Sequence, residues 1–231
     1  MRVQTRPPLV LPGRRGYAGG MPGPPTQTEP DDRPQAAVDW QRITRWAEAI
    51  RAGDLADIPA TFVRHGAAAP TLVWSPTVCD LRTAPLRHLL GHWSSLQDAG
   101  RLPSYRQIDP FDLRPALGYV MLIDTLVDSA DFRYRLYGSA LASISGADMT
   151  GRHLSELPAS PYVREFSIAV GHAVMHRREA VYTARSPVGA QETVVWERLV
   201  LPLVNEEDRV TRFLVGSTPT GRDGQLIRAV Y

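Results

Sequence analysis

The sequence predicts an α+β fold in which one antiparallel sheet is covered by helices on one face. The first observation is the order of the elements after residue 80, where strand-like runs stand at both ends and helical segments lie between them. The second is the pair of short polar connections, 128–131 and 205–208, which each join two strand-like runs. Connections this short favour hairpins and therefore antiparallel pairing.

Five segments have the composition of strands. They are residues 119–127, 132–137, 180–186, 193–204 and 209–218. The second run alternates, and this alternation predicts two faces. One face is expected to carry Phe132, Tyr134 and Leu136, and the other Arg133, Arg135 and Tyr137.

Two longer helices are expected in the same region. Residues 84–99 begin after Thr83, a good N-cap, and end before Gly100. The second helix begins at Ser160-Pro161 and runs to Arg177-Arg178. Its apolar stripe consists of Val163, Phe166, Val170 and Val174. Short helical pieces are expected near residues 110–117, 139–145 and 151–157.

The chain before this region divides into two parts. Residues 1–37 are rich in Pro, Gly and Arg and predict a disordered tail. Residues 38–81 predict an amphipathic helix followed by a linker. Such a short helix needs to dock on the main domain or on a partner. The candidate partner-binding residues are Trp40, Ile43, Trp46 and Ile50. Residues 221–231 are expected to form a C-terminal tail.

The composition excludes several kinds of site. All 26 basic residues are arginines, so the chain has neither a P-loop lysine nor an amine for a Schiff base. Cys79 is the only cysteine, which excludes an intrachain disulfide and a CxxC site. With a net charge of +2 and only isolated basic doublets, no nucleic-acid partner is expected. No apolar run is long enough to cross a bilayer, so we expect a cytoplasmic protein without membrane insertion.

A series of short motifs follows in order along the main region. They are Leu102-Pro103-Ser104, Ile108-Asp109-Pro110, Tyr134-Arg135-Leu136-Tyr137-Gly138-Ser139, Gly146-Ala147-Asp148-Met149-Thr150-Gly151 and Glu197-Arg198-Leu199-Val200-Leu201-Pro202-Leu203. As a set they resemble a bacterial family of short stand-alone PAS-domain proteins. Ser139 departs from the threonine that this family usually has there. The resemblance covers about residues 82–220 and implies a PAS-like five-stranded antiparallel sheet with a sensory or regulatory role.

Neither haem nor flavin is expected as a cofactor. PAS flavin photosensors use a cysteine within the domain, whereas Cys79 precedes it. PAS haem sensors use a histidine on the long helix. His172 and His176 lie on that helix but project away from its apolar stripe. The pair His88 and His92 has the spacing of two metal ligands, but it lacks the glutamate of a metalloprotease motif, and no metal site is expected.

The candidate ligand-binding residues come from the strands and the long helix. They are Tyr134, Arg135, Phe166, Val170, Tyr182, Trp196, Glu197 and Arg198. The resemblance places Arg135 and Glu197 at positions typical of the family. Two interpretations of this pair stay open: it orients a polar ligand in a pocket, or it forms an ion pair on the outer face of the sheet.

The resulting hypothesis is a sensory or regulatory protein that binds a small ligand or a protein partner. Its signal is expected to pass to a separate output protein, with a homodimer as an alternative assembly. No G-x-S-x-G motif or paired carboxylates are found, and no catalytic residue is assigned. One alternative is a ligand-free interaction module whose interior is filled by large residues such as Phe166, Tyr182 and Trp196. The second is a small-molecule enzyme that uses the same cavity, which requires a convergent acid and base.

Overall fold

The computed structural model describes residues 37–55, 57–186, 194–221 and 224–228. The tail expected at residues 1–37 therefore lies outside the described residues except for residue 37. No helix in the described ranges is both long and apolar enough to span a membrane.

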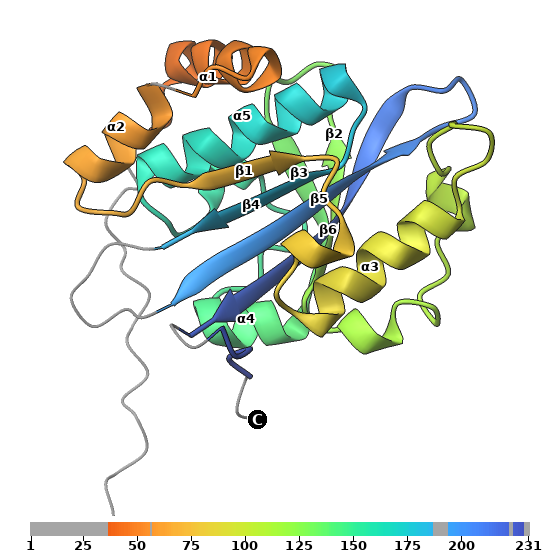
Figure 1. Ribbon diagram of the computed structural model, residues 1–231. Helices are drawn as coiled ribbons and strands as arrows, with labels where there is room; N and C mark the ends of the chain where they lie inside the picture. Colours follow the sequence, from red (N-terminus) through yellow and green to blue (C-terminus); the bar gives the residue numbers. More distant parts are fainter. Residues whose placement is uncertain (1–36, 56, 187–193, 222–223, 229–231) are drawn as a thin grey trace, which may run out of the picture. The chain divides into compact units, whose positions relative to one another are not determined.

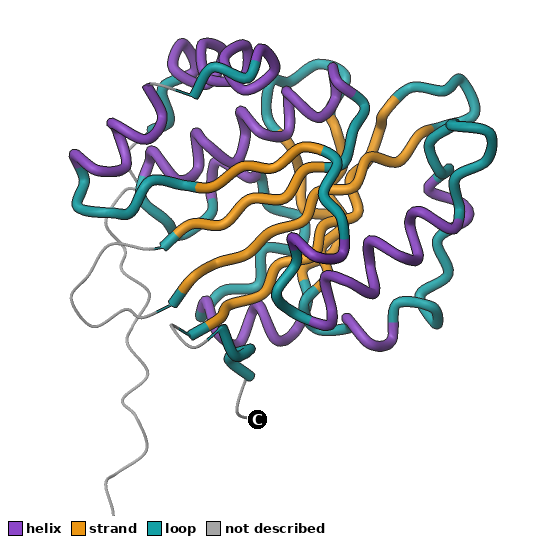
Figure 2. The backbone as a smooth tube through the Cα atoms, in the orientation of Figure 1, coloured by secondary structure: helices purple, strands orange, loops and turns teal. Residues whose placement is uncertain are grey.

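The described chain is built around one antiparallel sheet (Figure 2). Its strands are β1 (Thr71–Trp74), β2 (Val120–Thr125), β3 (Phe132–Tyr137), β4 (Val181–Arg185), β5 (Val195–Val204) and β6 (Val210–Thr220). They are arranged in the order β1-β4-β5-β6-β2-β3, and every neighbouring pair is antiparallel. The predicted α+β class and antiparallel sheet are confirmed.

The described sheet has six strands where five were expected, because the predicted linker contributes β1. This strand pairs with β4 from Thr71 opposite Ala184 to Trp74 opposite Val181. Only five residues lie between Pro70 and Pro76, too few to show an alternating pattern, and the sequence therefore did not predict this strand. The same stretch contains helix α2 (Asp57–Arg64) and a 3₁₀ turn, η1 (Val78–Asp80).

Helices cover both faces of the sheet, and the prediction of one covered face is wrong. Helix α5 (Pro161–Arg177) packs on one face and α3 (Ala84–Ser95) on the other (Figure 1). Leu86 and Leu89 of α3 are fully buried against Leu199 and Leu214 of the sheet. The sequence predicted the apolar stripe of α3, but the stripe alone does not determine which face of the sheet the helix covers.

Helix α1 (Trp40–Ala52) lies on the outer side of α5, together with α2 (Figure 1). Asp39 caps α1 by accepting a hydrogen bond from the Arg42 backbone nitrogen at 3.1 Å. The Asp39 backbone nitrogen in turn donates to Glu165 Oε1 of α5 at 2.9 Å, and Arg42 Nη1 donates to Glu165 Oε2 at 2.8 Å. One buried carboxylate on α5 therefore holds the first turn of α1.

Three short helical pieces lie close to their predicted positions. They are α4 (Ser139–Ser145) and two 3₁₀ turns, η3 (Arg114–Ala116) and η4 (Leu154–Glu156). A further 3₁₀ turn, η2 (Tyr105–Gln107), was not predicted. Thr83 occupies the N-cap position of α3, as predicted, but its hydroxyl does not cap the helix. It pairs instead with the Thr218 hydroxyl at 3.1 Å, which ties the start of α3 to β6.

A bulge in β3 changes which side chains point inward. Leu122 pairs with Leu136 and Ile123 pairs with Tyr134, so Arg135 is an extra residue on β3. The alternation shifts by one position at this point. Leu136 is therefore 44% exposed, and Tyr137 packs against the core in its place. The expectation that Leu136 shares a face with Phe132 and Tyr134 is wrong.

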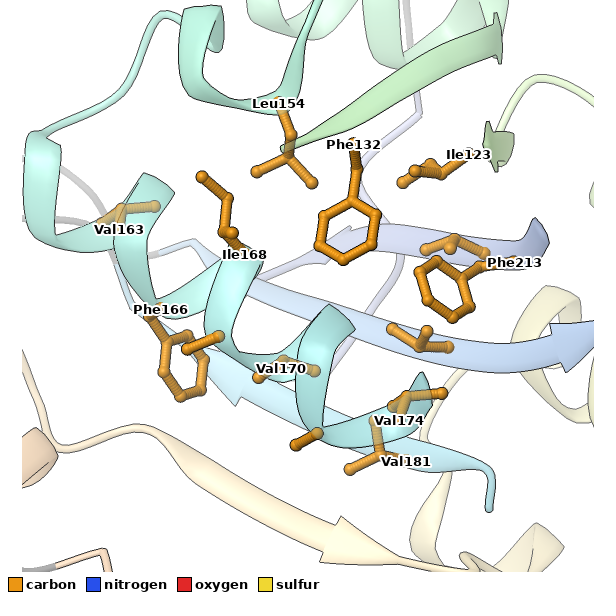
Figure 3. Packing of buried hydrophobic residues seen from close by; sticks show 14 of the residues in the cluster. Ile123, Phe132, Leu154, Val163, Phe166, Ile168, Val170, Val174, Val181 and Phe213 are labelled. Atoms are coloured by element: carbon orange, nitrogen blue, oxygen red, sulfur yellow. The ribbon is translucent and has the colours of Figure 1, made fainter. Parts of the chain in front are cut away.

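The interior between α5 and the sheet is mostly apolar (Figure 3). Phe132 of β3 and Phe213 of β6 meet there with ring centroids 5.4 Å apart. Val170 and Val174 of α5 belong to the same core.

We expect Gly216→Ala to destabilise the protein, because two leucines of α3 pack directly on this residue of β6. A Cβ atom at Gly216 would lie 2.6 Å from Leu86 Cδ2 and 2.6 Å from Leu89 Cδ1, and both leucines are fully buried. The expected loss is about 1–3 kcal/mol in the free energy of unfolding, measured with urea. Gly91→Ala is the matched control on the exposed side of α3, where a Cβ meets nothing within 4 Å. It should be neutral or gain up to about 1 kcal/mol; equal losses in both variants would contradict this packing.

Candidate functional site

A small cavity lies between α5 and the sheet. Its volume is about 20 Å³, enough for roughly one water molecule. Most of its wall is apolar and comes from Ile123, Phe132, Leu154, Phe166, Val170, Val200, Phe213 and Val215. Figure 3 shows several of these side chains packed between α5 and the strands. The rest of the wall is polar and includes Ser167, Thr183, Arg185 and Arg198.

The strand register brings the polar residues together at one end of the cavity. Arg198 of β5 stands opposite Thr183 of β4 on one side and opposite Ser217 of β6 on the other. All three belong to the sheet face that α5 covers, because Val200 and Val215, two residues away on their strands, are in the α5-side core. Arg185 lies two residues beyond Thr183, diagonal to Arg198 on the same face. Diagonal neighbours in a sheet have Cα atoms about 7–8 Å apart.

Both arginines lack a carboxylate partner within the described residues. Arg198 Nη1 donates a hydrogen bond to Ser167 Oγ at 3.3 Å, and the Ser167 hydroxyl donates one to the Val163 carbonyl oxygen at 2.9 Å. Burial lowers the pKa of Arg185 to about 9, and the positive charge of Arg198 adds to this shift. Arginine side chains remain protonated at neutral pH. The cavity therefore ends at two like charges.

Two buried hydroxyls in this region have no hydrogen-bond partner in the part of the chain that the structure describes. They belong to Tyr134 of β3, which is fully buried, and to Ser217, which is 1% exposed. Burial raises the pKa of Tyr134 to about 12, while the charges of Arg198 and Arg185 act in the opposite direction. Tyr134 is consequently a neutral donor at physiological pH. A buried donor without an acceptor costs about 1–3 kcal/mol, so an acceptor within reach of either hydroxyl would stabilise this region. Neither residue lines the cavity itself, but Ser217 stands opposite Arg198, which does.

The structure brings together only part of the predicted ligand-binding set. Phe166, Val170 and Arg198 line the cavity. Tyr134 does not, but it lies close enough to Arg185 and Arg198 for their charges to act on its pKa. Trp196 lies on the same face as Arg198 and packs against the core without lining the cavity.

Tyr182 and Glu197 are on the opposite face of the sheet, under α3, and assigning them to a pocket shared with Arg198 was wrong. Strand alternation separates Glu197 from Arg198. Glu197 is fully buried, accepts a hydrogen bond from Thr220 Oγ1 at 3.2 Å and lies 3.8 Å from Arg82 Nε. Burial raises its pKa, and the Thr220 hydrogen bond and the Arg82 charge oppose this shift. Burial likewise raises the pKa of Tyr182, with the Glu197 charge adding to it.

The two interpretations of Arg135 and Glu197 as a pair are both wrong. Arg135 is on edge strand β3, and two strands, β6 and β2, separate it from Glu197 on β5. Its guanidinium lies 3.5 Å from Asp124 Oδ2 on the neighbouring strand. The bulge at Arg135 places this side chain outside the interior, 56% exposed.

The residues weighed for cofactors and metals do not line the cavity. His172 Nε2 is 2.7 Å from the Ala130 carbonyl oxygen in the β2–β3 turn, and burial lowers the pKa of its imidazole. Cys79 is exposed in η1. Within the described ranges, no group of three or more His, Cys, Asp or Glu side chains is placed to hold a metal ion.

Three of the four candidate partner-binding residues are buried within the chain itself. Ile43, Trp46 and Ile50 are at most 1% exposed in the layer between α1 and α5. Trp40 alone of the four is exposed, at 42%. The sequence left docking on the main domain open as an alternative, and that is what the structure shows.

Sequence reasoning missed three polar residues that line the cavity, Ser167, Thr183 and Arg185, and it also missed Ser217, which stands opposite Arg198. The alternation of β4 gave a usable signal, because Thr183 and Arg185 share a face and an arginine is uncommon inside a sheet core. Ser217 could be placed only with the register of β5 and β6.

We expect Arg185→Met to stabilise the protein when no ligand is present. The methionine keeps much of the apolar stem and removes one of two like charges on neighbouring positions of the sheet. The gain should be up to about 1 kcal/mol in a urea titration. Arg45→Met, at an exposed position of α1, changes the net charge equally and should leave stability unchanged. A loss of stability in Arg185→Met alone would show that Arg185 has a favourable partner.

The comparisons with known proteins agree with the fold. No curated protein and no solved structure matches the chain. A family model described as a PAS domain matches residues 81–217, more than half of the sequence. This range begins just before α3 and includes β2 to β5, α4, α5 and most of β6. With this match and an antiparallel sheet that carries α5 on one face, the chain belongs to the PAS domain family.

Proposed function

We propose that this sensory or regulatory PAS protein binds a small polar ligand at the Arg185–Arg198 end of its interior and signals through a separate output protein. One observation carries the proposal: two arginines without a carboxylate partner among the described residues stand at the polar end of an otherwise apolar cavity, and the unpartnered hydroxyls of Tyr134 and Ser217 are buried beside them. Structural cores rarely keep such donors unsatisfied, because each costs free energy.

The size of the cavity limits what can bind. A volume of about 20 Å³ leaves no preformed room for a macrocycle or a tricyclic ring system. A small molecule can enter by displacing Arg198 from Ser167, since that hydrogen bond is long, at 3.3 Å. Both arginines are half-buried, so their side chains can turn outward without unfolding the strands.

The polar end is suited to binding rather than to catalysis. General acid–base chemistry needs a proton acceptor beside a donor. The described cavity wall contains arginine, serine and threonine side chains as its polar groups, with no carboxylate and no histidine. We therefore propose no enzymatic activity for this site.

Helix α5 connects the cavity to the outer helical layer. Ser167, which contacts Arg198, is two residues from Glu165, which holds the first turn of α1. A ligand that binds Arg198 would break its hydrogen bond to Ser167 on the cavity side of α5. A resulting shift of α5 would move Glu165 and alter its hydrogen bonds to Asp39 and Arg42. The proposed output is a changed packing of α1 and α2, read by another protein.

A ligand-free interaction module is the second candidate, and the small volume favours it. Phe132, Phe166 and Phe213 fill most of the interior. This alternative does not explain why two arginines without carboxylate partners and an unpartnered Tyr134 hydroxyl are placed in the interior.

We expect the wild-type protein to carry a small molecule when it is purified rapidly and examined by native mass spectrometry. Arg198→Met should lose the added mass, because the ligand then lacks its central cation. Arg45→Met should retain it. The same apo mass for wild type and Arg198→Met, together with no thermal shift in the presence of a metabolite extract, would contradict ligand binding and leave the interaction module.

We expect Glu165→Ala to release α1 from α5 while leaving the sheet folded. The variant loses two hydrogen bonds to a buried carboxylate, worth roughly 1–3 kcal/mol in the stability of the α1 layer. Limited trypsin digestion should then cut at Arg42 or Arg45 faster than in wild type. Glu48→Ala, which removes an exposed carboxylate from α1 itself, is the control. Unchanged cleavage would show that the Glu165 contacts do not hold α1.

A further inference from the structure

We infer that the ligand of this site is a small carboxylate with a short apolar tail, held by Arg185 and Arg198. This inference rests on the proposed function and names the chemical class of its ligand.

Charge is the first reason. Elsewhere in the described chain, half-buried arginines have carboxylates beside them. Arg42 Nη1 is 2.8 Å from Glu165 Oε2, and Arg212 Nε is 2.7 Å from Asp124 Oδ1. Arg185 and Arg198 form no such ion pair with the described residues, although they are neighbours on one sheet face. An anion placed between them would replace like-charge repulsion by attraction.

The neutral groups point to the same class of ligand. The buried Tyr134 and Ser217 hydroxyls lack partners among the described residues, and Ser217 stands directly opposite Arg198. Together with two guanidinium groups, they offer donors to an oxyanion. The planar guanidinium matches the two oxygens of a carboxylate. A neutral ligand would leave both charges unpaired.

Shape decides between a carboxylate and inorganic phosphate. Beyond the arginines, the wall consists of side chains such as Phe132, Phe166 and Val170. This apolar surface can pack against methylene or methyl groups, but it has no hydrogen-bond donors for the remaining oxygens of a phosphate. The cavity holds about 20 Å³, so the tail must be short or must displace neighbouring side chains.

The test is an NMR titration of the ¹⁵N-labelled full chain with four probes: acetate, propionate, propionamide and inorganic phosphate. Propionate is expected to bind best, with shifts concentrated at the Ser217 and Ser167 amides. Acetate should bind more weakly, because it lacks one buried methylene, worth roughly fourfold in affinity. Propionamide, which has nearly the same shape without the charge, should cause no saturable shift.

Three variants separate the contributions to binding. Arg198→Met should weaken propionate binding roughly 10- to 100-fold, as expected for loss of a charge-assisted hydrogen bond. Tyr134→Phe should weaken it roughly 2- to 10-fold and should itself be no less stable than wild type, because the deleted hydroxyl has no partner in the described structure. Arg45→Met should bind as wild type does.

The outcomes distinguish the inference from the proposed function. Propionate binding that depends on Arg198 supports both. Equal or tighter binding of propionamide or phosphate overturns the carboxylate assignment while the ligand site stands. An added mass in the native spectrum that no carboxylate displaces also overturns the assignment alone. If no probe binds and the native mass is that of the bare chain, both the inference and the ligand-binding function fail.

Discussion

The arrangement of the chain depends on burying helix α5 on two opposite sides. Eleven of its 17 residues are buried, and they include Arg164 and Glu165 as well as apolar side chains. A helix with so little polar surface cannot simply cover a sheet, because its outer side would remain in water. The layer of α1 and α2 meets that need, and Glu165 fixes its position by accepting hydrogen bonds from the Asp39 backbone and from Arg42.

The parts of the fold that the sequence predicted correctly are those with strong local signals. The β2–β3 hairpin and the start of α5 at Ser160-Pro161 follow from turn and helix-end chemistry that a few residues determine. The parts that it missed depend on contacts between distant segments. Strand β1 exists because β4 offers a free edge, and the bulge at Arg135 appears only when β2 and β3 are placed in register. The burial of Trp46 against α5 is of the same kind.

The candidate site shows the same division. Phe166 and Val170 could be chosen from the periodicity of one helix. Adjacent residues on β5 point to opposite sides of the sheet, one toward the core under α5 and the next toward the core under α3. Glu197 was assigned to the wrong core because strand alternation alone does not show which of the two sides a residue faces. The row of Thr183, Arg198 and Ser217 runs across three strands, so no local pattern contains it.

Both edges of the described sheet have features that hinder pairing with another strand. Edge strand β1 is only four residues long, and edge strand β3 is bulged and presents the exposed cations Arg133 and Arg135. Short, bulged or charged edges discourage addition of a further strand. Addition of a second copy of this chain by extension of the sheet is therefore disfavoured. The same edges lower the tendency of the sheet to seed aggregation.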